Sequence, residues 1–245
     1  MPRRFASIVL VVMAACGGGG EPARKPITPL DTQTTGTITG TVRVAGPIPS
    51  MKALQMTSEC RGEHPAPVLA GDVLVRDGLV ENAFVWVKDG LGDRGFPLPT
   101  DPVTIDQQGC LYRPHVVGAE VGQPIVFQNS DSVLHNVHGT PTVAAAWNFT
   151  MSVKGGQRTL RLNKPEVMVS VRCDVHPWMQ GWIGVVDHPY FFVTGTDGRF
   201  TLRDVPSGDY VVAAWHERFG TREAKVSLSA KGTQDVSFAF GSSGN

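Results

Sequence analysis

Four side chains with metal-binding chemistry stand at a spacing that is typical of a copper site. The segment Cys-Asp-Val-His-Pro-Trp-Met at 173–179 offers a thiolate, an imidazole and a thioether, and His135 lies thirty-eight positions before Cys173. Two His, one Cys and a weakly bound axial Met are the ligands of type 1 (blue) copper. The sequence therefore predicts one type 1 copper, held by His135, Cys173, His176 and Met179.

The elements that position these side chains follow from their surroundings. Three ligands on one short loop cannot enclose a metal ion, so the fourth must come from another strand. In residues 167–173 apolar and polar side chains alternate, which places Cys173 on the inward, apolar face of a strand. The segment 134–138 predicts the edge of a second strand, which carries His135.

Two alternatives concern the identity of the metal and of its axial ligand. Met151 and Met168 also offer thioethers, but neither lies on the ligand loop. Zinc binds Cys and His well, whereas a thioether is a poor zinc ligand. Met179 therefore favours copper over zinc.

These motifs resemble those of the cupredoxins over residues of about 103–186, and the ligand loop is most like that of the amicyanins, Cys-x2-His-Pro-aromatic-Met. The resemblance implies a Greek-key β-sandwich, the four ligands named above, and one-electron transfer with a redox protein partner. It further implies that Asn136 holds the two ligand segments together by hydrogen bonds. His176 would be the ligand nearest the surface.

The flanking segments carry a second resemblance. Strand and turn patterns at 40–44, 82–87, 197–202 and 205–215 resemble the carboxypeptidase regulatory-like domain, a small transthyretin-like β-sandwich. We therefore expect a split domain at 36–100 and 188–245, with the cupredoxin domain at 101–187 inserted in it. Three consecutive sandwiches, or a single enlarged one, are the alternatives. No segment has a long helical period, so an all-β class is predicted.

The first residues have the pattern of an export signal. A basic start at Arg3 and Arg4, an apolar run and a small-residue cleavage site predict a signal peptide at 1–15. Cys16 follows at once, which resembles a bacterial lipoprotein signal and implies lipidation of Cys16. A flexible linker at 16–35 and a place in the cell envelope, at the outer membrane, are then expected. Plain secretion is the alternative. The apolar run is too short to span a membrane, so the lipid would be the only anchor.

The remaining cysteines, Cys60 and Cys110, are predicted to form a disulfide, because an exported protein meets an oxidising compartment. A bridge over about 50 residues contributes roughly 3–4 kcal/mol in the chain-entropy model. Two free thiols, or a second metal site with His64 or His115, are the alternatives.

Composition narrows the function. Lys and Arg number 22, as do Asp and Glu, so nothing indicates a nucleic-acid partner, and a monomer is expected. Multicopper enzymes need several further His, but the chain has seven and no His-x-His pair, so we expect no enzyme. The hypotheses are an electron carrier, or a non-catalytic module that binds polysaccharide or an envelope partner and has a copper storage or sensing site.

Overall fold

The computed structural model describes residues 25–241. The predicted signal peptide, Cys16 and the first part of the predicted linker lie outside the described residues. Within 25–241 there are nineteen strands and one five-residue helix, so the all-β prediction is confirmed. In this range no helix is long and apolar enough to cross a membrane.

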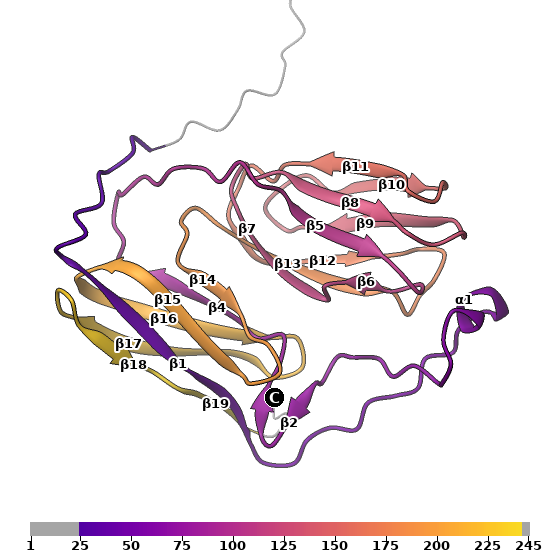
Figure 1. Ribbon diagram of the computed structural model, residues 1–245, viewed down its shortest axis with the longest axis horizontal. Helices are drawn as coiled ribbons and strands as arrows, with labels where there is room; N and C mark the ends of the chain where they lie inside the picture. Colours follow the sequence, from indigo (N-terminus) through magenta and orange to yellow (C-terminus); the bar gives the residue numbers. More distant parts are fainter. Residues whose placement is uncertain (1–24, 242–245) are drawn as a thin grey trace, which may run out of the picture.

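Two β-sandwiches lie side by side (Figure 1). The flanking sandwich comprises β1–β4 and β14–β19. One of its sheets has the order β15-β1-β3-β2, and β18 and β19 also pair with β1. The other has the order β14-β4-β16-β17. The bounds are β1 (Thr35–Ala45), β2 (Val75–Arg76), β3 (Leu79–Val80), β4 (Phe84–Asp89), β14 (Phe191–Val193), β15 (Arg199–Pro206), β16 (Gly208–His216), β17 (Gly220–Leu228), β18 (Thr233–Asp235) and β19 (Phe238–Gly241).

The central sandwich comprises β5–β13. A five-stranded sheet in the order β10-β9-β12-β13-β7 packs against a four-stranded sheet in the order β11-β8-β5-β6. The bounds are β5 (Val103–Gln107), β6 (Tyr112–Arg113), β7 (Val116–Glu120), β8 (Ile125–Asn129), β9 (His135–Thr140), β10 (Trp147–Met151), β11 (Gln157–Leu160), β12 (Glu166–Arg172) and β13 (Gln180–Val186). The chain thus leaves the flanking sandwich after β4 and returns to it at β14.

The Asp-Gly turn before β15 shows how local chemistry shapes the flanking sandwich. Gly198 has a φ of +59°, and a Cβ there would lie 2.8 Å from the carbonyl oxygen of Val42. The Asp197 side chain accepts a hydrogen bond from the Arg199 N–H at 3.1 Å. Glycine is therefore required by both conformation and space, and the turn starts β15 alongside β1.

A shared apolar cluster joins the two sandwiches. Its buried members are Phe84, Trp86, Val116, Val186 and Ala213, drawn from β4, β7, β13 and β16. The β-strands approach closely because two positions of the central sandwich lack a Cβ. A Cβ would lie 2.4 Å from the Phe191 ring at Gly118 and 2.5 Å from the Phe84 ring at Gly184. The two sandwiches therefore bury apolar surface against each other.

The segment between β1 and β2 crosses from one sandwich to the other. Its helix α1 (Ser58–Gly62) lies at the far end of the central sandwich in Figure 1. Although these residues fall within the range 36–100 that was assigned to the regulatory-like domain, Met56 and Cys60 pack into the core of the central sandwich.

Candidate metal centre

His135 is the first residue of β9, and a short ordered loop leads into it. The side-chain amide of Asn129 donates hydrogen bonds to the carbonyl oxygens of Val133 (3.1 Å) and Met151 (3.0 Å). Its oxygen accepts the N–H of Asp131 at 2.9 Å. Asn129 is fully buried, so its hydrogen bonds hold the loop from the inside and fix the start of β9.

The other three predicted ligands lie on the loop between β12 and β13. The Cys173 N–H donates to the carbonyl oxygen of Met179 at 3.1 Å, and the Met179 N–H donates to that of His176 at 2.9 Å. The paired strands below close the loop at Arg172 and Gln180. This short hydrogen-bonded loop holds the thiol, the imidazole and the thioether on one compact turn.

The structure brings His135, Cys173 and His176 together in the protein interior. The two Nδ1 atoms of the histidines are 2.9 Å apart, and Cys173 Sγ is 3.7 Å from His176 Nδ1. His135 is 0% exposed, Cys173 2% and His176 6%. Two nitrogens bound to one ion at about 2.0 Å lie at most about 4 Å apart, and a nitrogen and a sulfur at most about 4.3 Å. Both separations fit a single ion.

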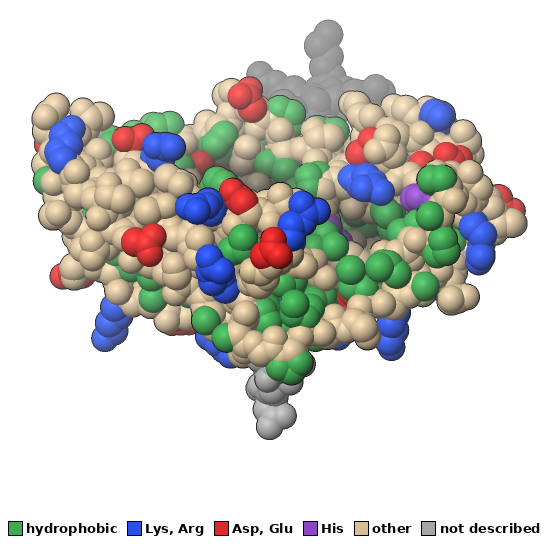
Figure 2. All heavy atoms as spheres, turned by 60° about the horizontal axis from the view of Figure 1, so that its bottom comes forward, with side chains coloured by type: hydrophobic (Ala, Val, Ile, Leu, Met, Phe, Trp, Pro, Cys, Tyr) green, Lys and Arg blue, Asp and Glu red, His purple; other side chains and the backbone are tan. Residues whose placement is uncertain are grey.

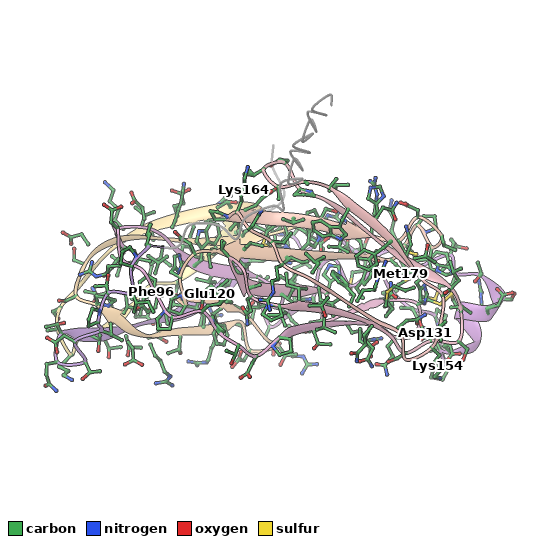
Figure 3. All side chains as sticks on the ribbon, turned by 90° about the horizontal axis from the view of Figure 1, so that it is seen from above. Phe96, Glu120, Asp131, Lys154, Lys164 and Met179 are labelled. Carbon is green, nitrogen blue, oxygen red and sulfur yellow. A yellow bond between two sulfur atoms is a disulfide. The ribbon has the colours of Figure 1, made fainter. Side chains whose placement is uncertain are left out.

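Two of the three candidate thioethers lie in the same core cluster as Cys173. Met179 is fully buried, and Figure 3 shows it at the same end of the elongated molecule as Asp131. Met151 pairs directly with His135 across β10 and β9. Met168, in contrast, packs against the cluster between the sandwiches. Only Met179 is bonded through its backbone to both Cys173 and His176.

Charge and hydrogen bonding shift the ionisation of these groups. Burial raises the pKa of the Cys173 thiol, but hydrogen bonds from His135 and from backbone groups outweigh burial and bring this pKa below its usual value. Burial opposes the charged form of His135, yet its hydrogen bonds to Asp131 and Cys173 raise its pKa. For His176, burial and then the neighbouring His135 lower the pKa. The site therefore favours a thiolate next to imidazole nitrogens.

Asn136 connects the two ligand segments. Its backbone N–H points at Cys173 Sγ, 3.5 Å away, and its side-chain oxygen accepts the Asp174 N–H at 2.6 Å. The Asp174 carboxylate in turn accepts hydrogen bonds from Asn136 (3.0 Å) and Asn148 (2.8 Å) and contacts His138 at 2.9 Å. The hydrogen bond with His138 is the largest cause that lowers the pKa of Asp174 to about 2.

Cys60 and Cys110 form a disulfide that ties α1 to the central sandwich. Both sulfurs and a ring nitrogen of His176 lie within 4.8 Å of one another. Trp178 donates its Nε1–H to the carbonyl oxygen of Cys110 at 3.1 Å. Because the two sulfurs are bonded to each other, they are neither free thiols nor thiolate ligands of a second metal site.

The sequence analysis did not single out Asp131. This carboxylate is 5% exposed in its side chain and lies 2.9 Å from His135 Nε2, the ring nitrogen that faces away from His176. It also accepts the N–H groups of Gly109 and Cys110, each at 2.7 Å. Its position four residues before His135 was the one available signal, and a loop carboxylate at that spacing has many other uses.

His188 and His216 also offer imidazole nitrogens, but both serve as hydrogen-bond acceptors in the protein interior. Both are buried, at 6% and 2% exposure. His188 Nδ1 accepts the N–H of Tyr190 at 3.1 Å, and His216 Nδ1 accepts that of Arg218 at 3.2 Å. Burial lowers the pKa of each to about 4. Among residues 25–241 neither belongs to a cluster of potential metal ligands.

The chain is similar to several solved structures over about a third of its length. A mutant of amicyanin in the oxidised state is 24% identical over 34% of this chain and 81% of that chain, with a TM-score of 0.32. The Cu-containing nitrite reductase from Thermus scotoductus SA-01 is 22% identical over 41% and 26%, with a TM-score of 0.32. A purple cupredoxin from Nitrosopumilus maritimus is 20% identical over 34% and 98%, with a TM-score of 0.30.

No family model and no curated protein matches the chain. The TM-scores are low, so the interpretation of the metal centre depends on the side chains of this protein alone.

Proposed function

We propose that this protein binds one type 1 copper through His135, Cys173, His176 and Met179 and that it transfers single electrons. The observation that carries the proposal is the convergence of two imidazole nitrogens and one thiol sulfur at a buried point. Separations of 2.9 and 3.7 Å between these donor atoms suit one ion, and the donor set is that of blue copper.

The chain's own residues supply what such a centre needs. Copper, when bound, contributes a one-electron couple. The lowered pKa of Cys173 favours the thiolate that binds the metal. The loop is closed by backbone hydrogen bonds, and all four side chains are at most 6% exposed. The ligands are therefore held in place when the charge of the site changes, and water is kept away from them.

A redox protein partner is part of the proposal. His176 is the most exposed of the four ligands. Its neighbour Val175 is 49% exposed, and Leu134, next to His135, is 45% exposed. Apolar side chains beside a ligand support brief contacts with such a partner. On the face drawn in Figure 2, basic and acidic side chains are interspersed, which supports a proposal without a nucleic-acid partner.

The place of action is proposed from the sequence. Lipidation of Cys16 would tether the protein to the bacterial envelope. Incorporation of a labelled fatty acid in cells that express the full chain, compared with Cys16→Ser, tests this. Equal labelling of the two proteins would argue against the anchor.

A storage or sensing role is the second candidate. The observation that favours it is α1, which the disulfide holds beside His176. A closed site of this kind would retain copper. Rapid electron exchange with a small inorganic oxidant and reductant supports the carrier. Slow exchange combined with very tight copper binding supports storage.

The test of the metal centre is the visible spectrum of the exported protein after loading with Cu(II). We expect an intense thiolate-to-copper band that ascorbate removes and ferricyanide restores, with one copper per chain. Cys173→Ser is the control and should lack the band. A colourless wild-type protein that is folded and metal-loaded would refute the proposed copper centre.

A further inference from the structure

Asp131 occupies a place at the metal centre that no ligand motif assigns to it. Its carboxylate lies in the core, with 5% of the side chain exposed. One oxygen accepts the Gly109 N–H, and the other accepts the Cys110 N–H and lies 2.9 Å from His135 Nε2. Every hydrogen bond of this carboxylate within residues 25–241 comes from a turn of the central sandwich or from the candidate ligand itself.

The turn that holds Asp131 is built for this contact. Gly109 and Cys110 both have positive φ angles, +65° and +53°, and their successive N–H groups point at the same carboxylate. Two aligned backbone N–H groups make an anion-binding concavity. The disulfide to Cys60 anchors the turn from the other side. The negative charge is therefore held at a fixed distance from His135.

The second histidine has a different environment. His176 contacts His135 and Cys173 through its Nδ1 atom, and among the described residues no carboxylate is hydrogen-bonded to it. The two imidazoles of the centre are thus unequal. Only His135 has an anionic hydrogen-bond acceptor behind it.

We propose that Asp131 is a positioning residue that sets the tautomer of His135 and lowers the reduction potential of the centre. By accepting the Nε2–H, it leaves the Nδ1 lone pair of His135 free toward His176 and Cys173. Its negative charge favours Cu(II) over Cu(I), because the oxidised ion carries one more positive charge. A carboxylate behind a histidine ligand fixes the ring and increases its basicity. This inference rests on the proposed copper centre.

The closing experiment compares Asp131→Asn with Asp106→Asn in the copper-loaded protein. Asp106, on β5, is the matched control. Its carboxylate accepts a hydrogen bond at 2.8 Å from Ser130, the residue before Asp131, but touches no candidate ligand. We expect Asp131→Asn to keep the blue band and to raise the ratio of Cu(I) to Cu(II) affinity about tenfold or more. A tenfold change corresponds to about 59 mV for a one-electron couple. Asp106→Asn should leave the potential unchanged.

A wild-type measurement covers the case in which Asp131→Asn does not fold. In the Cu(I)-loaded protein, which is diamagnetic, nitrogen NMR should find a proton on His135 Nε2 that exchanges slowly with water. A potential that is equal in Asp131→Asn and wild type would overturn the inference, as would a His135 bound to copper through Nε2. If the wild-type protein is blue and one of these two results is found, the inference about Asp131 is wrong but the proposed copper centre is not. A colourless wild-type protein would refute both the copper centre and the inference about Asp131.

Discussion

Two buried histidines of the flanking sandwich predict that the protein loses stability between neutral and mildly acidic pH. His188 and His216 each accept a backbone N–H at Nδ1. Adding a proton to that nitrogen breaks the hydrogen bond and puts a charge in the core, and burial accordingly lowers the pKa of each imidazole from 6.5 to about 4. Both residues are therefore neutral in the folded protein at neutral pH.

The sign of the effect follows from proton binding. Between pH 6.5 and 4 the unfolded chain binds a proton at each of these histidines, and the folded chain does not. Their contribution to stability is full above the unfolded pKa and falls as the pH drops toward the folded one. From about pH 7 to about pH 5 the loss is roughly 1.8 kcal/mol per histidine, or about 3.6 kcal/mol for the pair.

The assay is urea denaturation of the metal-free protein, followed by tryptophan fluorescence, near pH 7 and near pH 5. The matched variants are His188→Asn and His216→Asn, because the asparagine Oδ1 can accept the same N–H but does not titrate. Each variant loses ring packing at both pH values, so the readout is the change of the unfolding free energy with pH. Each should reduce the wild-type change by about 1.8 kcal/mol.

The comparison of variant with wild type also isolates the two histidines from the metal centre. His135 has a raised pKa, so its contribution to stability is present at low pH and is lost as the pH rises. That contribution is the same in the wild type and in the His188 and His216 variants. A double variant that loses as much stability as wild type on acidification would refute the reasoning.

Further predictions concern the axial ligand, the disulfide and the contact between the sandwiches. Met179→Leu should keep the fold but alter the copper spectrum and raise the reduction potential, because a weak donor to Cu(II) is lost. Met151→Leu should change neither the spectrum nor the potential. The reverse pattern would identify Met151 as the axial ligand. Replacing Cys60 and Cys110 together by Ala should lower the free energy of unfolding by about 4 kcal/mol in the chain-entropy model for a loop of 50 residues; unchanged urea midpoints would contradict this. Gly184→Val should separate the sandwiches, since its Cβ would lie 2.5 Å from an aromatic ring of the other one; scattering profiles that match wild type would count against that contact.

The sequence predicted those features of the site that depend on neighbouring residues in the chain. The alternation in residues 167–173 predicted an inward Cys173, and Val169, Val171 and Cys173 are at most 2% exposed. Val167 departs from the pattern and packs against the cluster between the sandwiches. The reason is a shift in the pairing of β12 with β13 between Glu166 and Val169, which a period of two cannot anticipate.

Long-range contacts explain what the sequence could not predict. About forty residues of chain separate α1 from the first strand of the central sandwich. The disulfide, the burial of Met56 and the contact of His64 with the carbonyl oxygen of Gly109 hold this segment there. Asp131 carries no motif, because its role is defined by a turn 21 positions earlier. Local periodicity contains no information about such pairs.

The turn at Cys110 is the point where these long-range contacts meet. Its sulfur forms the disulfide with Cys60, and its N–H donates a hydrogen bond to Asp131, which contacts His135. Its carbonyl oxygen accepts a hydrogen bond from Trp178 on the ligand loop. The two ligand segments come from different strands, yet both are braced by this single residue. A disturbance of the turn would therefore reach His135 and the Cys173 loop together, so the geometry of the centre depends on the disulfide as well as on its ligands.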